Sequence, residues 1–291
     1  MANGGIIGPV NTVTPAVSET ITTFNSSGTF TAGRTGNVDH LVVAGGGSGG
    51  FGPYRRGTGG GGAGGYRTGS GSIPVISGTG YTITIGAGGA GGTGSTNGNP
   101  SVFSSITSTG GGKGGATPDG SAGPGSPGGS GGGVAQGGTA GAGNTPPVSP
   151  SQGFSGGCRA PAPDDYLAGS GGGGSGGAGS ALQGVPGSPA YNGGAGGVGT
   201  ANSISGSSVT YGVGGQGGTW YSCGSSSGTE NTGNAGSGGA AYTGGAGPTG
   251  PAGAGGSGIV IVKEPAIPAT APGMWSMNSV YEFVKDGNWT N

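Results

Sequence analysis

Glycine runs in which every third residue carries a side chain dominate this sequence and constrain its fold most strongly. In 86–94 the side chains belong to Ala87, Ala90 and Thr93, and 193–199 repeats the spacing. A repeat of three fits neither a β-strand, which repeats every two residues, nor an α-helix, which repeats every 3.6. It fits the extended left-handed helix with three residues per turn, in which bare glycines let neighbouring helices approach closely.

Two interpretations of these runs remain open. Gly/Ser-rich composition is typical of flexible linkers and of disordered chains. The regular repeat, and the strand-like segments that bracket the runs, favour an ordered bundle whose N–H and C=O groups pair between neighbouring helices. The runs recur along the chain near 44–50, 57–65, 86–94, 110–116, 120–133, 134–141, 169–179, 193–199, 212–219 and 233–256.

Composition excludes several classes of protein. Glycine supplies 87 of the 291 residues, and only 6% are charged, whereas an ordinary globular domain has about 25% charged residues. Eight Lys and Arg against nine Asp and Glu leave no basic surface for nucleic acid. No stretch of about 18 apolar residues predicts a membrane span. The first ten residues also lack the basic and apolar regions of a secretion signal.

Short β-rich segments frame the glycine. We expect 19–24 and 28–31 to form a hairpin around a turn at 25–28. Further strands are predicted at 38–43, 81–85, 101–107 and 258–262, several of which run directly into glycine. Together they predict a small sheet that clamps the bundle.

The sequence therefore predicts a mainly β and irregular fold. A bundle of extended glycine helices, three residues per turn and similar to polyglycine II, is clamped by a small β-sheet, and a short C-terminal α-helix follows. Three regions are expected: an N-terminal linker or attachment segment at 1–18, the glycine-rich domain at 19–264, and a linker with the helix at 265–291.

The C-terminal helix is predicted near 277–286 because its apolar residues follow the spacing of one helical face. A helix this short is marginal alone, so we expect it to dock on another surface. The attachment candidates are apolar or aromatic: Trp275, Met277, Val280, Tyr281, Val284 and Trp289.

Few residues suggest chemistry, and we expect no enzyme, no cofactor and no metal site. The single histidine, His40, lies in a predicted strand and is expected to pack there. Cys158 and Cys223 lack the spacing of a zinc site, and both a disulfide and two free thiols remain possible. Asp164 and Asp165 are adjacent, so their carboxylates diverge and do not form a glycosidase pair.

Aromatic and charged residues avoid the glycine runs and gather between them, as binding residues on a rigid scaffold do. The alternative is that they plug the ends of the bundle and cover its backbone. The receptor-binding candidates are Tyr54, Arg55, Arg56, Phe154, Arg159, Asp164, Asp165, Tyr166, Tyr191, Trp220 and Tyr221.

The order of these motifs resembles a known family. The strand before the first glycine run at 28–50, YTITIGAGGAGG at 81–92, SVFSSITSTGGGKGG at 101–115 and the closing GIVIV at 258–262 fall in the order of the glycine-rich domain of bacteriophage tail-fibre and other virion proteins. The resemblance covers about 19–264. The two ends of the chain also resemble end segments of cyanophage-type structural proteins.

The resemblance implies a function. Related tail-fibre adhesins fold as stacked glycine helices whose connecting loops contact the host receptor. A phage tail-fibre or fibre-tip adhesin is therefore expected, located in the virion and assembled in the host cytoplasm. Its expected partners are other tail proteins, a host-surface glycan or outer-membrane protein, and further copies of itself. The alternative is a structural virion component, such as a decoration or connector protein, without receptor binding. An ice-binding or cell-wall protein is a more distant third class.

Overall fold

The computed structural model describes residues 18–52, 57–117, 123–135, 137–158, 168–181, 193–219, 225–239 and 250–266. Strands and glycine runs together form one compact unit, Ile21–Glu264. The division into 1–18, 19–264 and 265–291 stays a prediction, because most residues of the two outer regions lie outside the described ones.

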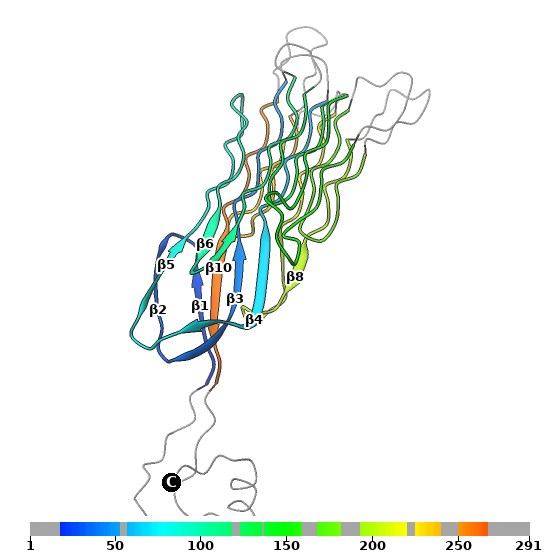
Figure 1. The fold of residues 1–291 in the computed structure, drawn as a ribbon. Helices are drawn as coiled ribbons and strands as arrows, with labels where there is room; N and C mark the ends of the chain where they lie inside the picture. The colour runs from blue at the N-terminus through cyan, green and yellow to red at the C-terminus, as the bar shows by residue number, and fades with distance from the viewer. Residues whose placement is uncertain are drawn as a thin grey trace, which may run out of the picture. The chain divides into compact units, whose positions relative to one another are not determined.

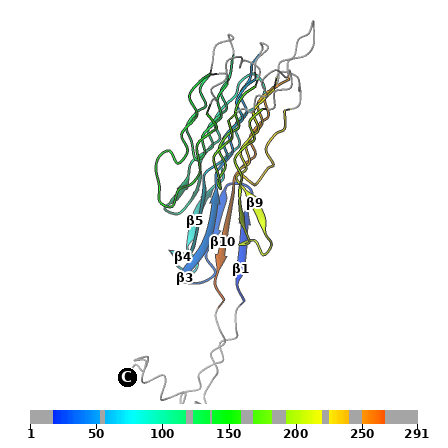
Figure 2. The same ribbon diagram turned by 90° about the vertical axis from the view of Figure 1, so that its right-hand side faces the viewer.

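Ten strands form three sheets at one end of this unit. One sheet has the order β1-β10-β3-β4, the second β2-β5-β6-β7, and β8 pairs with β9. The glycine runs extend from these strands side by side (Figure 1, Figure 2). The strand bounds are β1 Thr20–Phe24, β2 Gly28–Thr31, β3 Gly36–Val43, β4 Tyr66–Val75, β5 Gly80–Thr84, β6 Ser101–Phe103, β7 Ile106–Ser108, β8 Thr200–Asn202, β9 Val209–Tyr211 and β10 Ile259–Glu264.

The sheet β1-β10-β3-β4 is apolar on both faces at its centre, which explains the consecutive apolar residues 41–43 in β3 and 259–262 in β10. Val42 lies opposite Val260 in the antiparallel pair, and both pack against the second sheet. There Phe30 and Phe103 meet edge to face, with ring centroids 6.0 Å apart. Leu41 points to the opposite face, where it joins a smaller cluster with Tyr211 of β9.

Backbone hydrogen bonds join the glycine runs. Three successive N–H groups of a run donate to three different neighbouring segments, and the pattern repeats every three residues. In 44–50, Ala44, Gly47 and Gly50 donate to carbonyls of 59–65 at 2.8–3.0 Å. The next residue of each turn, Gly45 or Ser48, donates to a carbonyl of 96–99. The third residue of each turn, Gly46 or Gly49, donates to a carbonyl of 253–256. Each run is therefore hydrogen-bonded on three sides by segments far apart in the sequence.

This close spacing leaves no room for side chains at most glycines. A Cβ on Gly47 would lie 2.3 Å from the carbonyl oxygen of Gly112, and one on Gly172 would lie 1.8 Å from that of Gly61. Real Cβ atoms essentially never approach backbone atoms below 3.0 Å. Because backbone cannot rotate away as a side chain does, these positions require glycine.

The predicted fold class needs correction. The described residues are β-sheet and irregular backbone without any helix, whereas the prediction included a short C-terminal α-helix. Glycine disfavours α-helix by about 1 kcal/mol per residue, which excludes helices from most of the unit. The segment predicted as a helix, 277–286, lies outside the described residues.

Two strand predictions also need correction. Strands β1 and β2 are not a hydrogen-bonded hairpin, because β1 joins β10 and β2 joins β5. The predicted strand 101–107 is split into β6 and β7 by a turn in which Ser104 has a φ of 52°. The sequence does not reveal β4, the longest strand, because glycine, serine and Pro74 give it low strand propensity.

The packing of the runs predicts which positions tolerate a side chain. A Cβ on Gly214 would lie 2.3 Å from the carbonyl oxygen of Gly172, whereas Ala90 is exposed. We expect Gly214→Val to reduce the free energy of unfolding by at least about 3 kcal/mol, measured by guanidinium denaturation. The control Ala90→Val should change it by less than about 0.5 kcal/mol. Equal tolerance at both positions would contradict the close packing.

Candidate functional site

Several described residues that border internal undescribed segments contact one another at the end of the bundle away from the sheets, which we call the distal end (Figure 1). Here Thr58 is fully buried, and its hydroxyl donates to the carbonyls of Gly50 and Gly239, both at 2.8 Å. The N–H of Gly218 donates to the Thr58 carbonyl at 2.7 Å. These bonds tie together runs that border 53–56, 220–224 and 240–249.

Further contacts extend the distal end to other parts of the chain. Thr117 donates its N–H to the carbonyl of Phe51 at 2.9 Å, and Ala168 forms a β-bridge with Thr219. Ala135 donates to the carbonyl of Gly123 at 3.0 Å. Described residues from distant parts of the sequence are therefore hydrogen-bonded to one another at this one end.

Most of the predicted binding residues lie outside the described residues, in segments that border the distal end. Phe154 is the exception: it is 43% exposed, and its N–H donates to the Gly174 carbonyl at 3.1 Å. The residues outside are Tyr54, Arg55, Arg56, Arg159, Asp164, Asp165, Tyr166, Tyr191, Trp220 and Tyr221, and the attachment candidates Trp275, Met277, Val280, Tyr281, Val284 and Trp289.

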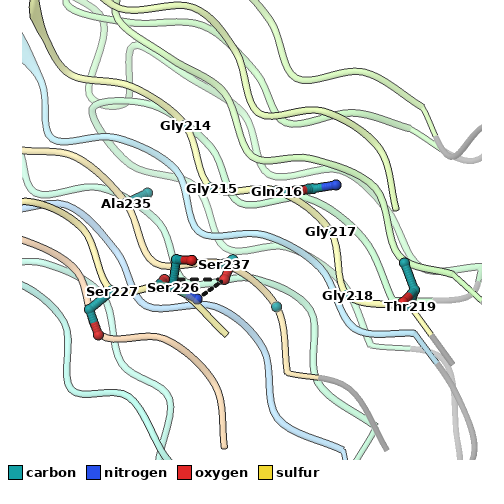
Figure 3. A pocket seen from close by; sticks show the side chains of 11 residues that line it. Gly214, Gly215, Gln216, Gly217, Gly218, Thr219, Ser226, Ser227, Ala235 and Ser237 are labelled. Carbon is teal, nitrogen blue, oxygen red and sulfur yellow. Dashed lines mark hydrogen bonds between the residues drawn. The ribbon is translucent and has the colours of Figure 1, made fainter. Parts of the chain in front are cut away.

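A polar groove of about 340 Å³ opens between three runs, 213–219, 225–228 and 234–239 (Figure 3). Backbone of Gly214–Gly218 forms one wall, and the side chains of Ser226 and Ser227 belong to another. Ser237 Oγ accepts the N–H of Ser226 at 2.6 Å and donates to its carbonyl at 3.1 Å. No acidic or basic side chain is among the described residues that line the groove. The sequence signal is weak, because the side chains there are mostly small or uncharged: Gln216, Thr219, Ala235 and the serines at 225–227 and 237.

A second cavity, of about 260 Å³, lies beside β4 and includes His40, Arg67 and Ser72. His40 is 4% exposed in β3, as the sequence predicts, and its Nδ1 lies 3.1 Å from Ser72 Oγ. Burial lowers the pKa of His40, and the positive charge of Arg67 lowers it further, against the smaller opposing effect of Asp39.

Asp39 does not complete a catalytic triad with His40 and Ser72. Its Oδ1 accepts the Ser70 hydroxyl and the Gly71 N–H, each at 2.7 Å, and Oδ2 lies 3.5 Å from Lys263 Nζ. Burial raises the pKa of Asp39, but these three partners together lower it below its ordinary value. The carboxylate is therefore held on the opposite face of β3 from His40, where it joins β3, β4 and β10.

Other kinds of site are not found in the described part of the chain. It contains no group of three or more His, Cys, Asp or Glu that could hold a metal ion. Among the same residues there is no helix with the length and apolar character to cross a bilayer. Cys158 is an exposed free thiol, and Cys223 lies outside the described residues.

Comparison with known proteins identifies the family. The family model described as "Glycine-rich domain" matches residues 22–264, which is most of the chain and nearly all of the compact unit. No curated protein matches the chain. The chain belongs to the glycine-rich domain family.

The environment of His40 predicts a depressed titration. His40 is the single histidine of the chain, so one NMR signal reports its imidazole. We expect a midpoint below the ordinary 6.5, and Arg67→Gln should raise it by removing a positive charge. Since the neutral form is favoured in the folded state, stability is complete above pH 6.5 and declines as pH falls toward the folded-state pKa. A midpoint at or above 6.5 would contradict the buried, neutral imidazole.

Proposed function

We propose that this member of the glycine-rich domain family is a structural protein of a bacteriophage particle, acting as a tail-fibre or fibre-tip adhesin. In this proposal the segments between glycine runs bind a host-surface glycan or outer-membrane protein. Phage origin is supported by the sequence resemblance to tail-fibre and virion proteins. The adhesin role is supported by the arrangement of the compact unit.

The observation that carries the proposal is the separation of the two ends of this unit. It begins at β1 and ends at β10, which are neighbours in one sheet. Described residues that border inter-run segments, including Gly52, Gly57, Thr219 and Gly239, belong to the distal end by their contacts with Thr58, Thr117 and Ala168. Attachment and recognition can therefore use opposite ends of one scaffold.

The scaffold between these ends suits a binding protein. Its runs are cross-linked by backbone hydrogen bonds of about 2.9 Å on several sides, as between 59–65 and 109–115. Binding residues on loops gain affinity when a rigid framework limits the conformational freedom lost on binding. The segment 53–56, which contains Tyr54 and Arg55, is four residues long between the described Gly52 and Gly57.

Under this proposal the ends of the chain attach it to other tail proteins. Segment 1–18 and the apolar residues near 277–286 serve that attachment, and further copies of the chain assemble beside it. The protein resides in the virion and acts without an enzymatic step or cofactor. A decoration or connector protein without receptor binding is the competing function, and the two differ in what the inter-run segments do.

Adsorption of particles tests the receptor-binding role. We expect purified particles that carry Tyr54→Ala, Arg55→Ala and Trp220→Ala together to adsorb at least about tenfold more slowly, because Tyr, Arg and Trp contribute most to binding energy at interfaces. A matched variant with Ile76→Ala and Val198→Ala removes side chains that are 61% and 64% exposed elsewhere. It should adsorb at the normal rate. Normal adsorption of the triple variant would favour the decoration or connector function.

Truncation tests the attachment role. Removing 274–291 should reduce incorporation of the protein into particles, because the apolar docking residues are lost. The purified truncated protein should retain the unfolding midpoint of the full chain, since the compact unit ends at Glu264. Quantitative immunoblotting of purified particles measures incorporation. Undiminished incorporation would show that another part of the chain provides attachment.

A further inference from the structure

The groove between 213–219, 225–228 and 234–239 arises from one break in the hydrogen-bond pattern of the bundle. Runs 213–219 and 234–239 are parallel: Ala235 donates to the carbonyl of Val213, and Gly238 donates to that of Gln216, at 2.9 Å in both cases. The pair Gln216 and Ser237 therefore repeats, one turn later, the arrangement of the pair Val213 and Asn234. Ser237 occupies the position beside Gln216 that Asn234 occupies beside Val213.

This equivalence shows what the groove lacks. The N–H of Val213 donates to Asn234 Oδ1 at 2.9 Å. One turn later the serine side chain is shorter, and its hydroxyl is engaged by Ser226. Consequently the N–H of Gln216 has no hydrogen-bond partner among the described residues, and by the three-residue repeat it is directed at the space beside Ser237. A ligand oxygen placed there would accept this N–H as Asn234 does one turn away.

The remaining lining groups define the chemistry of such a ligand. Hydroxyls of Thr219, Ser226 and Ser227 and the carboxamide of Gln216 border the groove, together with glycine backbone (Figure 3). Hydroxyl and amide groups both donate and accept hydrogen bonds, and none of these carries a charge. The volume of about 340 Å³ lies within the range of small-molecule sites, and only Ala235 adds an apolar side chain.

We propose that this groove binds one unit of a neutral saccharide, with a sugar oxygen accepting the N–H of Gln216. The inference rests on the proposed receptor-binding function, for which it names the ligand class and a site on the bundle itself. Neutral sugar hydroxyls match a wall of uncharged donors and acceptors and replace the water that otherwise solvates them. An anionic sugar would find no cation among the lining residues.

An additional extended glycine segment is the other occupant that the bundle suggests, but the groove walls oppose it. Runs approach closely only where both faces lack Cβ atoms, as the contact of about 2 Å from a Cβ on Gly215 to the Gly236 carbonyl shows. The groove wall at Ser226 and Ser227 carries side chains that are exposed. These side chains keep a further backbone away and leave room for a ligand with its own hydroxyls.

Amide NMR of the purified full chain tests the site. The probes are neutral tetrasaccharides of glucose, galactose, mannose and N-acetylglucosamine, with a galacturonate tetramer as the charged comparison. We expect at least one neutral probe to shift the amide signals of Gln216 and its neighbours Gly214–Gly218, and the charged probe to leave them unchanged. Ser237→Asn supplies the missing acceptor and fills the groove, so binding should weaken at least tenfold.

Two further variants separate loss of binding from loss of fold. Ala90→Asn adds the same side chain at an exposed position outside the groove and should bind normally. If Ser237→Asn fails to fold, the double variant Gln216→Ala and Ser226→Ala removes two exposed side chains without altering the backbone, and it should also weaken binding.

Three results would overturn the groove assignment. One is the absence of any shift at Gln216 with millimolar neutral saccharide. Another is a shift confined to residues elsewhere, which would leave receptor binding intact but move the site. The third is a shift caused by a glycine-serine peptide and by no saccharide. Because these measurements use purified protein, their outcome is distinct from particle adsorption, which tests the inter-run segments.

Discussion

Direct hydrogen bonding between extended backbones is the interaction on which this structure depends. A run such as 59–65 donates in rotation to 109–115, 170–173 and 233–236, so its polar groups pair with protein rather than with water. Each bond contributes on the order of 1 kcal/mol net, but an unpaired buried N–H or C=O would cost more than that. The bundle therefore requires nearly complete pairing, and complete pairing requires bare glycine at the contacts. This constraint explains the composition better than any demand for flexibility.

The sheets supply what glycine cannot. Runs of glycine offer few apolar side chains, and a chain of bare backbone has a large conformational entropy to lose on folding. The buried aromatic and branched side chains are concentrated in the sheets, around Phe30, Phe103 and Val42. Strands β3 and β10 pair in a fixed register and continue into 44–50 and back into 253–256, which also hydrogen-bond to each other. A small hydrophobic core thus fixes the register of a bundle that has little hydrophobic core of its own.

Sequence reasoning reaches some features of this arrangement and misses others for physical reasons. The repeat of three can be read from the sequence because close backbone contacts require glycine. Strands β3 and β10 can be predicted because both of their faces are buried, which makes consecutive residues apolar. Which run lies beside which is hidden, since the runs are nearly identical in sequence. Strand β4 is hidden by Gly69, Gly71 and Pro74, and its pairing depends on β3. Of the predicted binding residues, only Phe154 is among the described ones.

The groove cannot be predicted from the sequence for a related reason, because it depends on which runs are neighbours. It also suggests how a bundle of nearly identical glycine runs could present a distinct binding site. Asn234 and Ser237 look like unrelated polar residues until the parallel alignment with 213–219 makes them equivalent. Inside the bundle, hydroxyls of Thr58, Ser170 and Ser175 bond to neighbouring backbone and leave the lattice intact. At the surface, a side chain one atom too short, or engaged elsewhere, leaves a backbone donor exposed beside a gap. Because the close glycine contacts leave no room for a side chain, such gaps arise at the positions that carry side chains. If this scaffold binds a ligand as proposed, the contacts would come from those positions and from the segments between runs.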